Sequence, residues 1–228
     1  MSVNVVREID NWVHIRRVLV SVSDKTGLDL LVPALVEINP QVHFYSTGGT
    51  FSAIAQILGS EKAAAHLTQV SDYTGQPETQ GGLVKTLDFK IYLGLLTETY
   101  NVAHQADLSR TGALSLDMVV VNLYPFQATV ARPDVTVEEA RAHIDIGGPC
   151  MLRAAAKNYL RVAAVCDPAD YGPLLSFLRE NRGCLDLARR FELARKAFAH
   201  TAAYDAAIRD FLAQVDPSTV AHVYPLLH

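Results

Sequence analysis

The sequence has few cysteines, and none of them forms a recognisable framework. Cys150, Cys166 and Cys184 fit neither the ligand spacing of a zinc site nor a disulfide pattern. The histidines are scattered along the chain, which also argues against a metal site. We therefore expect reduced thiols, no bound metal and a cytoplasmic location.

Long apolar segments and basic clusters are missing as well. No apolar run is long enough to cross a bilayer, and Arg7, Glu8 and Asp10 lie where a signal peptide would need its apolar stretch. The formal net charge is −4, so the electrostatic footprint of a nucleic-acid-binding protein is absent. Hydrophobic residues make up 50% of the chain, which is ample for a core. We expect a folded domain with no nucleic-acid or membrane partner.

Short apolar runs rich in β-branched residues recur along the chain and predict strands that are buried on both faces. Helical patterns cover 27–38 and 51–58, between the early runs. Alternation of strands and helices is typical of a parallel, doubly wound α/β sheet. The predicted strands are Val18–Val22, Val42–Ser46, Ile91–Leu96, Met118–Val121 and Val162–Val165.

Beyond about residue 130 the pattern becomes mainly helical. Thr136 and Glu139 resemble a capping box, and 185–215 predicts one long or kinked helix. We therefore divide the chain into an N-terminal extension (1–16), an α/β core (17–130) and a helical extension that completes the site (131–228).

Two polar loops directly follow the first two predicted strands. Residues 21–27 read Ser-Val-Ser-Asp-Lys-Thr-Gly, and 47–50 read Thr-Gly-Gly-Thr. Backbone N–H groups at a helix start, together with a lysine, can bind an anion. Neither loop has the P-loop spacing, and each alone could be a helix cap. Because both follow strands of one parallel sheet, they meet at the edge where such sheets bind ligands.

Two further segments add reactive side chains at the same edge. Lys85 and Thr86 follow a glycine pair before another predicted strand. Lys85 could bind phosphate or take part in the chemistry, or it is an exposed lysine in a glycine turn. Asn122 and Tyr124 follow the strand that begins at Met118, although Tyr124 could simply pack beneath a turn.

The segment 144–158 is built like a helix start that carries a carboxylate and cations. Gly147 and Gly148 allow close approach of a ligand, and Pro149 suits the first helical turn. Arg153 and Lys157, four residues apart, share one helix face. Taken alone, this segment could also be an alanine-rich surface helix.

These motifs, in this order, closely resemble the IMP cyclohydrolase domain of the bifunctional purine-biosynthesis protein that also carries AICAR formyltransferase. The resemblance covers residues 17–212 and includes 196–205, which resembles the closing helix of that domain. It implies a methylglyoxal-synthase-like fold, a purine nucleoside monophosphate ligand, no cofactor and a possible homodimer. Because the sequence ends at His228, we expect no formyltransferase domain and formylation by another protein.

The resemblance also implies a role for each matching residue. The catalytic group matches Lys85, Tyr124, Asp145 and Lys157, and Asn122 and Ile146 lie near the reacting base. Phosphate and ribose binding falls to Ser23, Asp24, Lys25, Thr26, Thr47, Gly48, Gly49, Thr50 and Thr86.

In the reaction of that family, the carboxamide nitrogen of formyl-AICAR ribotide attacks the formyl carbon, and water leaves to give IMP. The resemblance implies that Lys157, assisted by Tyr124, stabilises charge on the formyl oxygen. Asp145 receives the carboxamide proton and Lys85 transfers the proton that departs with water, or these two roles are exchanged.

Four positions depart from the family pattern. Leu83 and Asp88 replace an arginine and a histidine beside Lys85, Phe89 replaces a proline, and Tyr92 replaces the next histidine. We expect these changes to reshape the wall of the site. They leave open a paralogue that closes a related ring on a modified nucleotide in nucleoside natural-product biosynthesis. A nucleotide-sensing module without catalysis is the third alternative.

Overall fold

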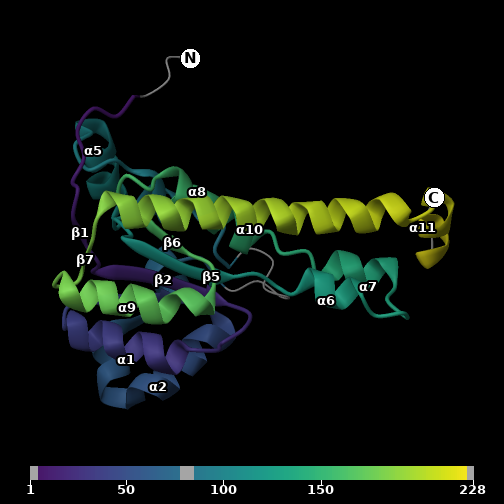
Figure 1. The fold of residues 1–228 in the computed structure, drawn as a ribbon, viewed down its shortest axis with the longest axis horizontal. Helices are drawn as coiled ribbons and strands as arrows, with labels where there is room; N and C mark the ends of the chain where they lie inside the picture. The colour runs from purple at the N-terminus through teal and green to yellow at the C-terminus, as the bar shows by residue number, and fades with distance from the viewer. Residues whose placement is uncertain (1–4, 78–84, 225–228) are drawn as a thin grey trace.

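The computed structural model describes residues 5–77 and 85–224, and its centre is a five-stranded parallel sheet (Figure 1). A separate antiparallel pair joins β1 and β7. The strands are β1 (Val13–His14), β2 (Arg17–Val22), β3 (His43–Ser46), β4 (Leu67–Gln69), β5 (Met118–Asn122), β6 (Ala163–Val165) and β7 (Cys184–Leu185).

Helices occupy most of the remaining described chain. The first six are α1 (Leu28–Ile38), α2 (Gly48–His66), α3 (Val70–Thr74), α4 (Phe89–Leu96), α5 (Val102–Thr111) and α6 (Phe126–Val130). They are followed by α7 (Val137–Ala142), α8 (Gly147–Lys157), the 3-10 turn η2 (Pro168–Asp170), α9 (Tyr171–Glu180), α10 (Leu187–Gln214) and α11 (Pro217–Val223). Within the described ranges, no helix is both long and apolar enough to span a membrane.

The order of the strands fixes where a ligand can enter. The sheet runs β4-β3-β2-β5-β6, with every neighbouring pair parallel. The chain moves outward from β2 to β4 and then returns to place β5 on the other side of β2. Loops leaving β2 and β5 therefore diverge, and open α/β sheets bind ligands in the crevice at such a point. The predicted doubly wound α/β class is confirmed.

Alternating side chains of the strands build two apolar layers. In β2, Val18 and Val20 face α1 and α9, whereas Leu19 faces the opposite layer with Val119 and Val121 of β5. Figure 1 shows α1 and α9 on one side of the sheet and α8 and α10 on the other. Continuous apolar runs predicted these strands correctly because both faces of the sheet are covered by helices.

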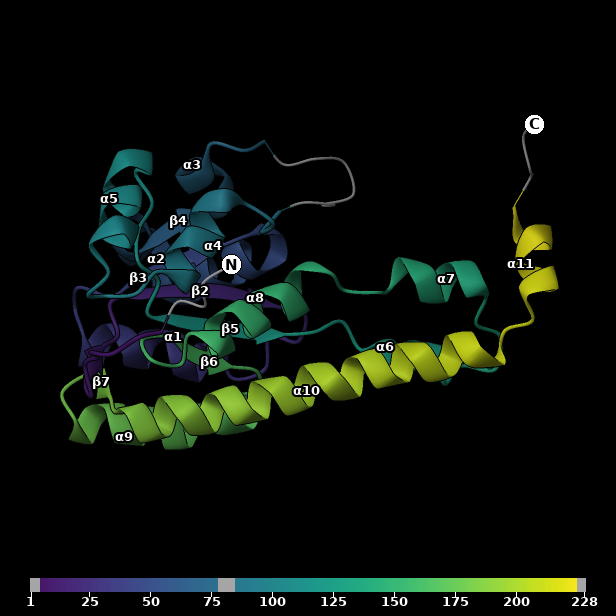
Figure 2. The ribbon, with the colours of Figure 1, turned by 90° about the horizontal axis from the view of Figure 1, so that it is seen from above.

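The helical part beyond residue 130 is only partly separate from the sheet. Helix α10 packs on α8 and β6, and then runs on past the sheet beside α6 (Figure 2). Because β6 belongs to this part yet completes the sheet, the two parts share one core. The boundary drawn at residue 130 stays a prediction. The predicted long helix and the capping box formed by Thr136 and Glu139 are confirmed.

One predicted strand is wrong. The run Ile91–Leu96 lies in helix α4, where Ile91 and Leu95 occupy one buried face and the Asp88 carboxylate caps the first turn by accepting the Lys90 N–H at 2.7 Å. A short apolar run cannot be distinguished from a buried helix by periodicity alone. Lys85 consequently precedes a helix. The edge strand β4 was missed because it has only three residues.

Candidate functional site

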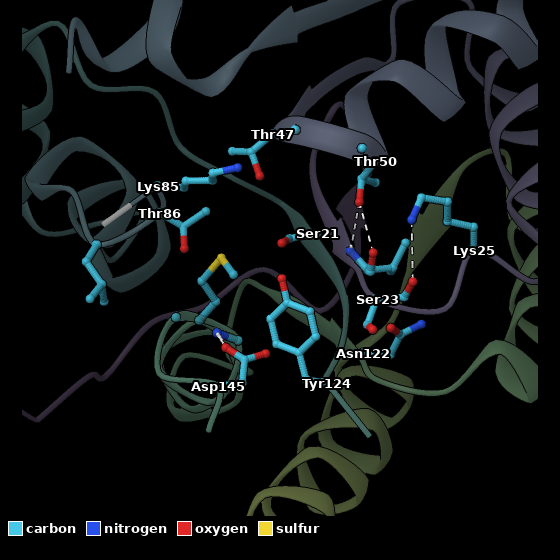
Figure 3. Close-up of a pocket in the computed structure, with 17 residues that line it drawn as sticks. Ser21, Ser23, Lys25, Thr47, Thr50, Lys85, Thr86, Asn122, Tyr124 and Asp145 are labelled. Atoms are coloured by element: carbon cyan, nitrogen blue, oxygen red, sulfur yellow. Dashed lines mark hydrogen bonds between the residues drawn. The ribbon is translucent and has the colours of Figure 1, made fainter. Parts of the chain in front are cut away.

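A polar cavity of about 240 Å³ lies at the carboxyl edge of the sheet, outside β2, β3 and β5 (Figure 3). Loops from both halves of the chain meet there, as the strand order requires. The lining residues are Ser21, Val22, Ser23, Lys25, Thr47, Gly48, Gly49, Thr50, Lys85, Thr86, Leu87, Asn122, Tyr124, Asp145, Gly147, Gly148 and Met151.

One end of the cavity is formed by the start of α2 and two lysines. Helix α2 begins at Gly48 after Thr47, whose side chain makes no capping hydrogen bond. A Cβ added to Gly48 would lie 3.1 Å from Lys85 Nζ, and one added to Gly49 would lie 3.8 Å from Lys25 Nζ. Both ammonium groups therefore lie next to the first N–H groups of the helix. Helix N–H groups, helix dipole and two cations together form an anion site.

The shape of this end depends on hydrogen bonds between the loops. Asn122 accepts the Asp24 N–H at 2.9 Å and donates to the Asp24 carbonyl at 2.7 Å. The buried Thr50 hydroxyl accepts the Val22 N–H at 3.2 Å and donates to the Val22 carbonyl at 3.0 Å. Asn122 and Thr50 thus hold the loop after β2 against α2 and β5.

Asp145 forms the opposite end of the cavity. One of its carboxylate oxygens accepts the Gly148 N–H at 2.8 Å, at the start of α8. Burial raises the pKa of Asp145, and hydrogen bonds from the backbone of Gly148 and Tyr124 only partly offset this effect. A raised carboxyl pKa in a ligand cavity is typical of a group that exchanges protons.

The start of α8 lies close to its neighbours. A Cβ at Gly147 would lie 2.7 Å from Thr86 Oγ1, and one at Gly148 would lie 2.6 Å from Asp145 Oδ2. A side chain at either position would therefore displace Thr86 or Asp145. The Tyr124 hydroxyl points into the cavity between these groups and Ser21 (Figure 3).

Most of the predicted site residues meet in this one cavity. They are Ser23, Lys25, Thr47, Gly48, Gly49, Thr50, Lys85, Thr86, Asn122, Tyr124 and Asp145. Asp24 and Thr26 do not line it; the Asp24 carboxylate accepts hydrogen bonds from Thr26, which shape the loop. The Ile146 side chain is exposed, beside the cavity in sequence but outside its lining.

Lys157 is not brought to the cavity. It is the last residue of α8, whereas the cavity touches the first residues of that helix. Lys157 lies ten positions after Gly147 along the helix, a rise of about 15 Å. Its side chain is exposed. The catalytic role implied for Lys157 stays a prediction that this cavity does not support.

Sequence reasoning missed four lining side chains, Ser21, Val22, Leu87 and Met151. Met151 follows Gly147 by four residues, so helical periodicity could have placed it on the same face of α8. Ser21 and Leu87 lie within motifs that were already noted, but their orientation depends on the strand register and the turn.

The departures from the family pattern lie largely outside the lining. Asp88 caps α4, Phe89 is exposed, and Tyr92 packs in the layer beneath α8. In the part of the chain that the structure describes, none of these three residues lines the cavity. Leu83 lies outside the described residues. The expected reshaping of the site wall is thus not supported at the three positions that are described.

Comparison with known sequences agrees with this fold. The family described as "MGS-like domain" matches residues 28–150, and that described as "AICARFT/IMPCHase bienzyme" matches residues 155–226. The first match covers more than half of the chain, so the chain belongs to the MGS-like domain family.

Among individual relatives, the chain is 50% identical over 202 residues to the bifunctional purine biosynthesis protein PurH of Magnetococcus marinus, covering 89% of this chain and 36% of that protein. Identity to PurH of Bacillus subtilis is 46% over 201 residues, covering 88% and 38%. The chain therefore spans little more than a third of these relatives. The resemblance to the IMP cyclohydrolase part of the bifunctional family is confirmed.

A solved structure of similar extent is the crystal structure of ForH. It matches this chain with a TM-score of 0.70 and 30% sequence identity, covering 87% of this chain and 99% of that chain.

Proposed function

We propose that the chain is an IMP cyclohydrolase that closes the second ring of formyl-AICAR ribotide to give IMP and water. The observation that carries this proposal is the single cavity that joins an anion site at α2 to Asp145 and Tyr124 at α8. The PurH relatives support the choice of substrate.

The two ends of the cavity suit the two ends of such a nucleotide. The phosphate would accept hydrogen bonds from the start of α2 and from Lys25 and Lys85. The reacting base would then extend towards Thr86, Tyr124 and Asp145. Lys85 could bind the phosphate or take part in the chemistry, and its position beside Gly48 favours anion binding.

Asp145 and Tyr124 supply the proton transfer in this proposal. Asp145 accepts a proton from the carboxamide nitrogen as that nitrogen bonds to the formyl carbon. The Tyr124 hydroxyl donates a hydrogen bond to the formyl oxygen, which gains charge. The formamide nitrogen then gives up its proton and forms the C=N bond of the new ring as the carbon–oxygen bond breaks. The oxygen leaves as water, having taken up that proton and the one that Asp145 received from the carboxamide nitrogen. The positive end of the α8 dipole also stabilises the negative charge on that oxygen.

Positioning alone contributes little because both reacting groups already belong to one molecule. Freezing a few rotors is worth about 0.5–1.5 kcal/mol each. A positioned acid or base contributes about 10²–10⁴-fold, so the proton-transfer group dominates the expected rate enhancement.

A paralogue acting on a modified nucleotide is the second candidate. The match to ForH, a protein with a name other than PurH and the same fold, favours it. The higher identity to PurH and the position of Asp88, Phe89 and Tyr92 outside the lining favour the first candidate.

Absorbance monitoring of purified protein with formyl-AICAR ribotide tests the proposal. We expect turnover to IMP. Faster turnover of a base-modified analogue would favour the paralogue, whereas tight binding of IMP without turnover of either compound would favour a nucleotide sensor.

The anion site gives a separate prediction. Lys25→Met should weaken IMP binding about 10- to 100-fold, because a charge-assisted hydrogen bond is worth about 1.5–3 kcal/mol. Lys62→Met, at an exposed position near the far end of α2, is the matched control and should bind as the wild type does. Calorimetric titration with IMP measures both. Equal affinities would place the phosphate elsewhere.

A further inference from the structure

Tyr204 of α10 connects the helical extension to the reacting end of the cavity. It is 8% exposed, and its ring packs edge-on against Phe126 with ring centroids 6.1 Å apart. Its hydroxyl accepts the Asp145 N–H at 2.8 Å and donates to the His143 carbonyl at 3.3 Å. Tyr204 does not line the cavity, so any effect on the reaction must pass through Asp145.

Asp145 is consequently held from two sides. Tyr204 fixes its backbone, while the N–H groups of Gly148 and Tyr124 fix its carboxylate. Little room for alternative placements remains, because even a Cβ on Gly148 would lie 2.6 Å from the carboxylate oxygen. Loss of the Tyr204 hydroxyl would leave the Asp145 N–H without this partner, and the loop would shift to regain one.

We propose that Tyr204 is a positioning residue for ring closure: its hydroxyl anchors the backbone of Asp145 and so fixes the carboxylate against the substrate. The proposal rests on the proposed function, and it makes α10 part of the catalytic apparatus. A displacement of a reacting group by 1 Å can lower a rate about 10²-fold.

A purely structural tyrosine would behave differently, and the chain contains a matched example. The Tyr73 hydroxyl accepts the Leu114 N–H at 2.8 Å, the same distance at which the Tyr204 hydroxyl accepts the Asp145 N–H. Leu114 precedes β5, at the edge of the sheet opposite to the cavity. Tyr73→Phe therefore removes an equivalent hydrogen bond without touching Asp145.

The titration of Asp145 provides a readout that a structural role would not change. Burial raises the pKa of Asp145. The other ionisable groups lining the cavity are Lys25, Lys85 and Tyr124. Outside the cavity lining, Tyr204 contacts Asp145 from α10, the charge of the neighbouring Asp205 acts on Tyr204, and the exposed His143 lies two residues from Asp145. If the loop loosens, water reaches the carboxylate and its pKa falls towards the ordinary aspartate value.

The experiment compares wild type, Tyr204→Phe and Tyr73→Phe by steady-state kinetics across pH. We expect Tyr204→Phe to lower kcat about 10- to 100-fold, with KM within about twofold of wild type and the acid limb of kcat moved to lower pH. Tyr73→Phe should keep kcat and the pH profile of wild type, and thermal unfolding should show a similar stability loss in both variants. An unchanged kcat in Tyr204→Phe, or an equal loss of kcat in both variants, overturns the proposal.

A second measurement separates this proposal from the proposed function. Carbon-13 NMR of the Asp145 carboxyl reports its pKa without any turnover. If the Asp145 pKa falls in Tyr204→Phe but not in Tyr73→Phe, the anchoring role is supported even if formyl-AICAR ribotide is not converted. An Asp145 pKa equal to that of wild type in Tyr204→Phe overturns it, whether or not the wild type is a cyclohydrolase.

Discussion

Asp145→Asn is expected to lower kcat about 10²–10⁴-fold, the range that a positioned acid or base contributes. Asparagine has the shape of aspartate, and its oxygen can still accept the Gly148 N–H. The variant therefore removes the proton acceptor with little change of shape. KM should stay within a few fold of wild type, since the phosphate is bound at the other end of the cavity. Single-turnover and steady-state absorbance assays measure both quantities.

The pH dependence follows from the raised pKa of Asp145. Wild-type kcat should fall on the acid side with a midpoint above about 3.9, the ordinary aspartate pKa. For stability, an acid with a raised folded pKa favours folding most when it is protonated. That contribution is lost as the pH rises from the unfolded pKa to the folded pKa. At neutral pH, Asp145→Asn should thus unfold at a temperature no lower than that of wild type.

Asp210→Asn is the control for this prediction. It removes a carboxylate from an exposed position of α10, outside the cavity lining. We expect this control variant to have the kcat and the pH profile of the wild type. If Asp145→Asn retained full activity while Lys157→Ala lost it, the reaction would take place outside this cavity, and the catalytic role implied for Lys157 would be correct.

The anion end of the site could be predicted from sequence because its determinants are local. A buried strand, a polar loop and a glycine pair at a helix start place Lys25, Gly48 and Gly49 at one edge of any parallel sheet. The same reasoning failed for Ile91–Leu96, whose apolar run suits a buried strand or a buried helix equally well.

The other end depends on contacts between distant parts of the chain. Tyr204 and Asp145 are 59 residues apart, and no local pattern predicts their hydrogen bond. Lys157 illustrates the reverse problem. A motif that keeps Asp145 and Lys157 in one segment does not keep them in one cavity, because an α-helix of eleven residues separates its two ends by about 15 Å.

The second large effect is expected at Arg190, which is fully buried near the start of α10. Its guanidinium donates to five carbonyl oxygens, and burial lowers the pKa of Arg190. The acceptors and distances are Leu185 at 2.5 Å, Asp10 and Leu160 at 2.9 Å, and Asn11 and Tyr159 at 3.0 Å. These carbonyls belong to the N-terminal segment, the turn after α8, and β7, so a single side chain joins three segments to α10.

Arg190→Met should lower the free energy of unfolding by about 3–5 kcal/mol. An unpaired buried polar group costs about 1–3 kcal/mol, and partial relaxation prevents five such costs from adding in full. Arg190→Lys should recover little, because an ammonium has three donors and lacks the planar fork of five. Urea unfolding measures the change, and Arg195→Met, at an exposed position of the same helix, should stay within about 0.5 kcal/mol of wild type.

The consequence for function follows from the position of Arg190 on the helix that carries Tyr204. The guanidinium fixes α10 to the turn between α8 and β6, and this contact sets the register at which Tyr204 meets Asp145. Arg190→Met, assayed where it remains folded, should therefore also lose kcat, whereas Arg195→Met should not. If the Arg190→Met protein has wild-type stability, water replaces the guanidinium at these carbonyls. If its stability is reduced but its kcat is that of wild type, the contact between Tyr204 and Asp145 holds α10 in place without the guanidinium.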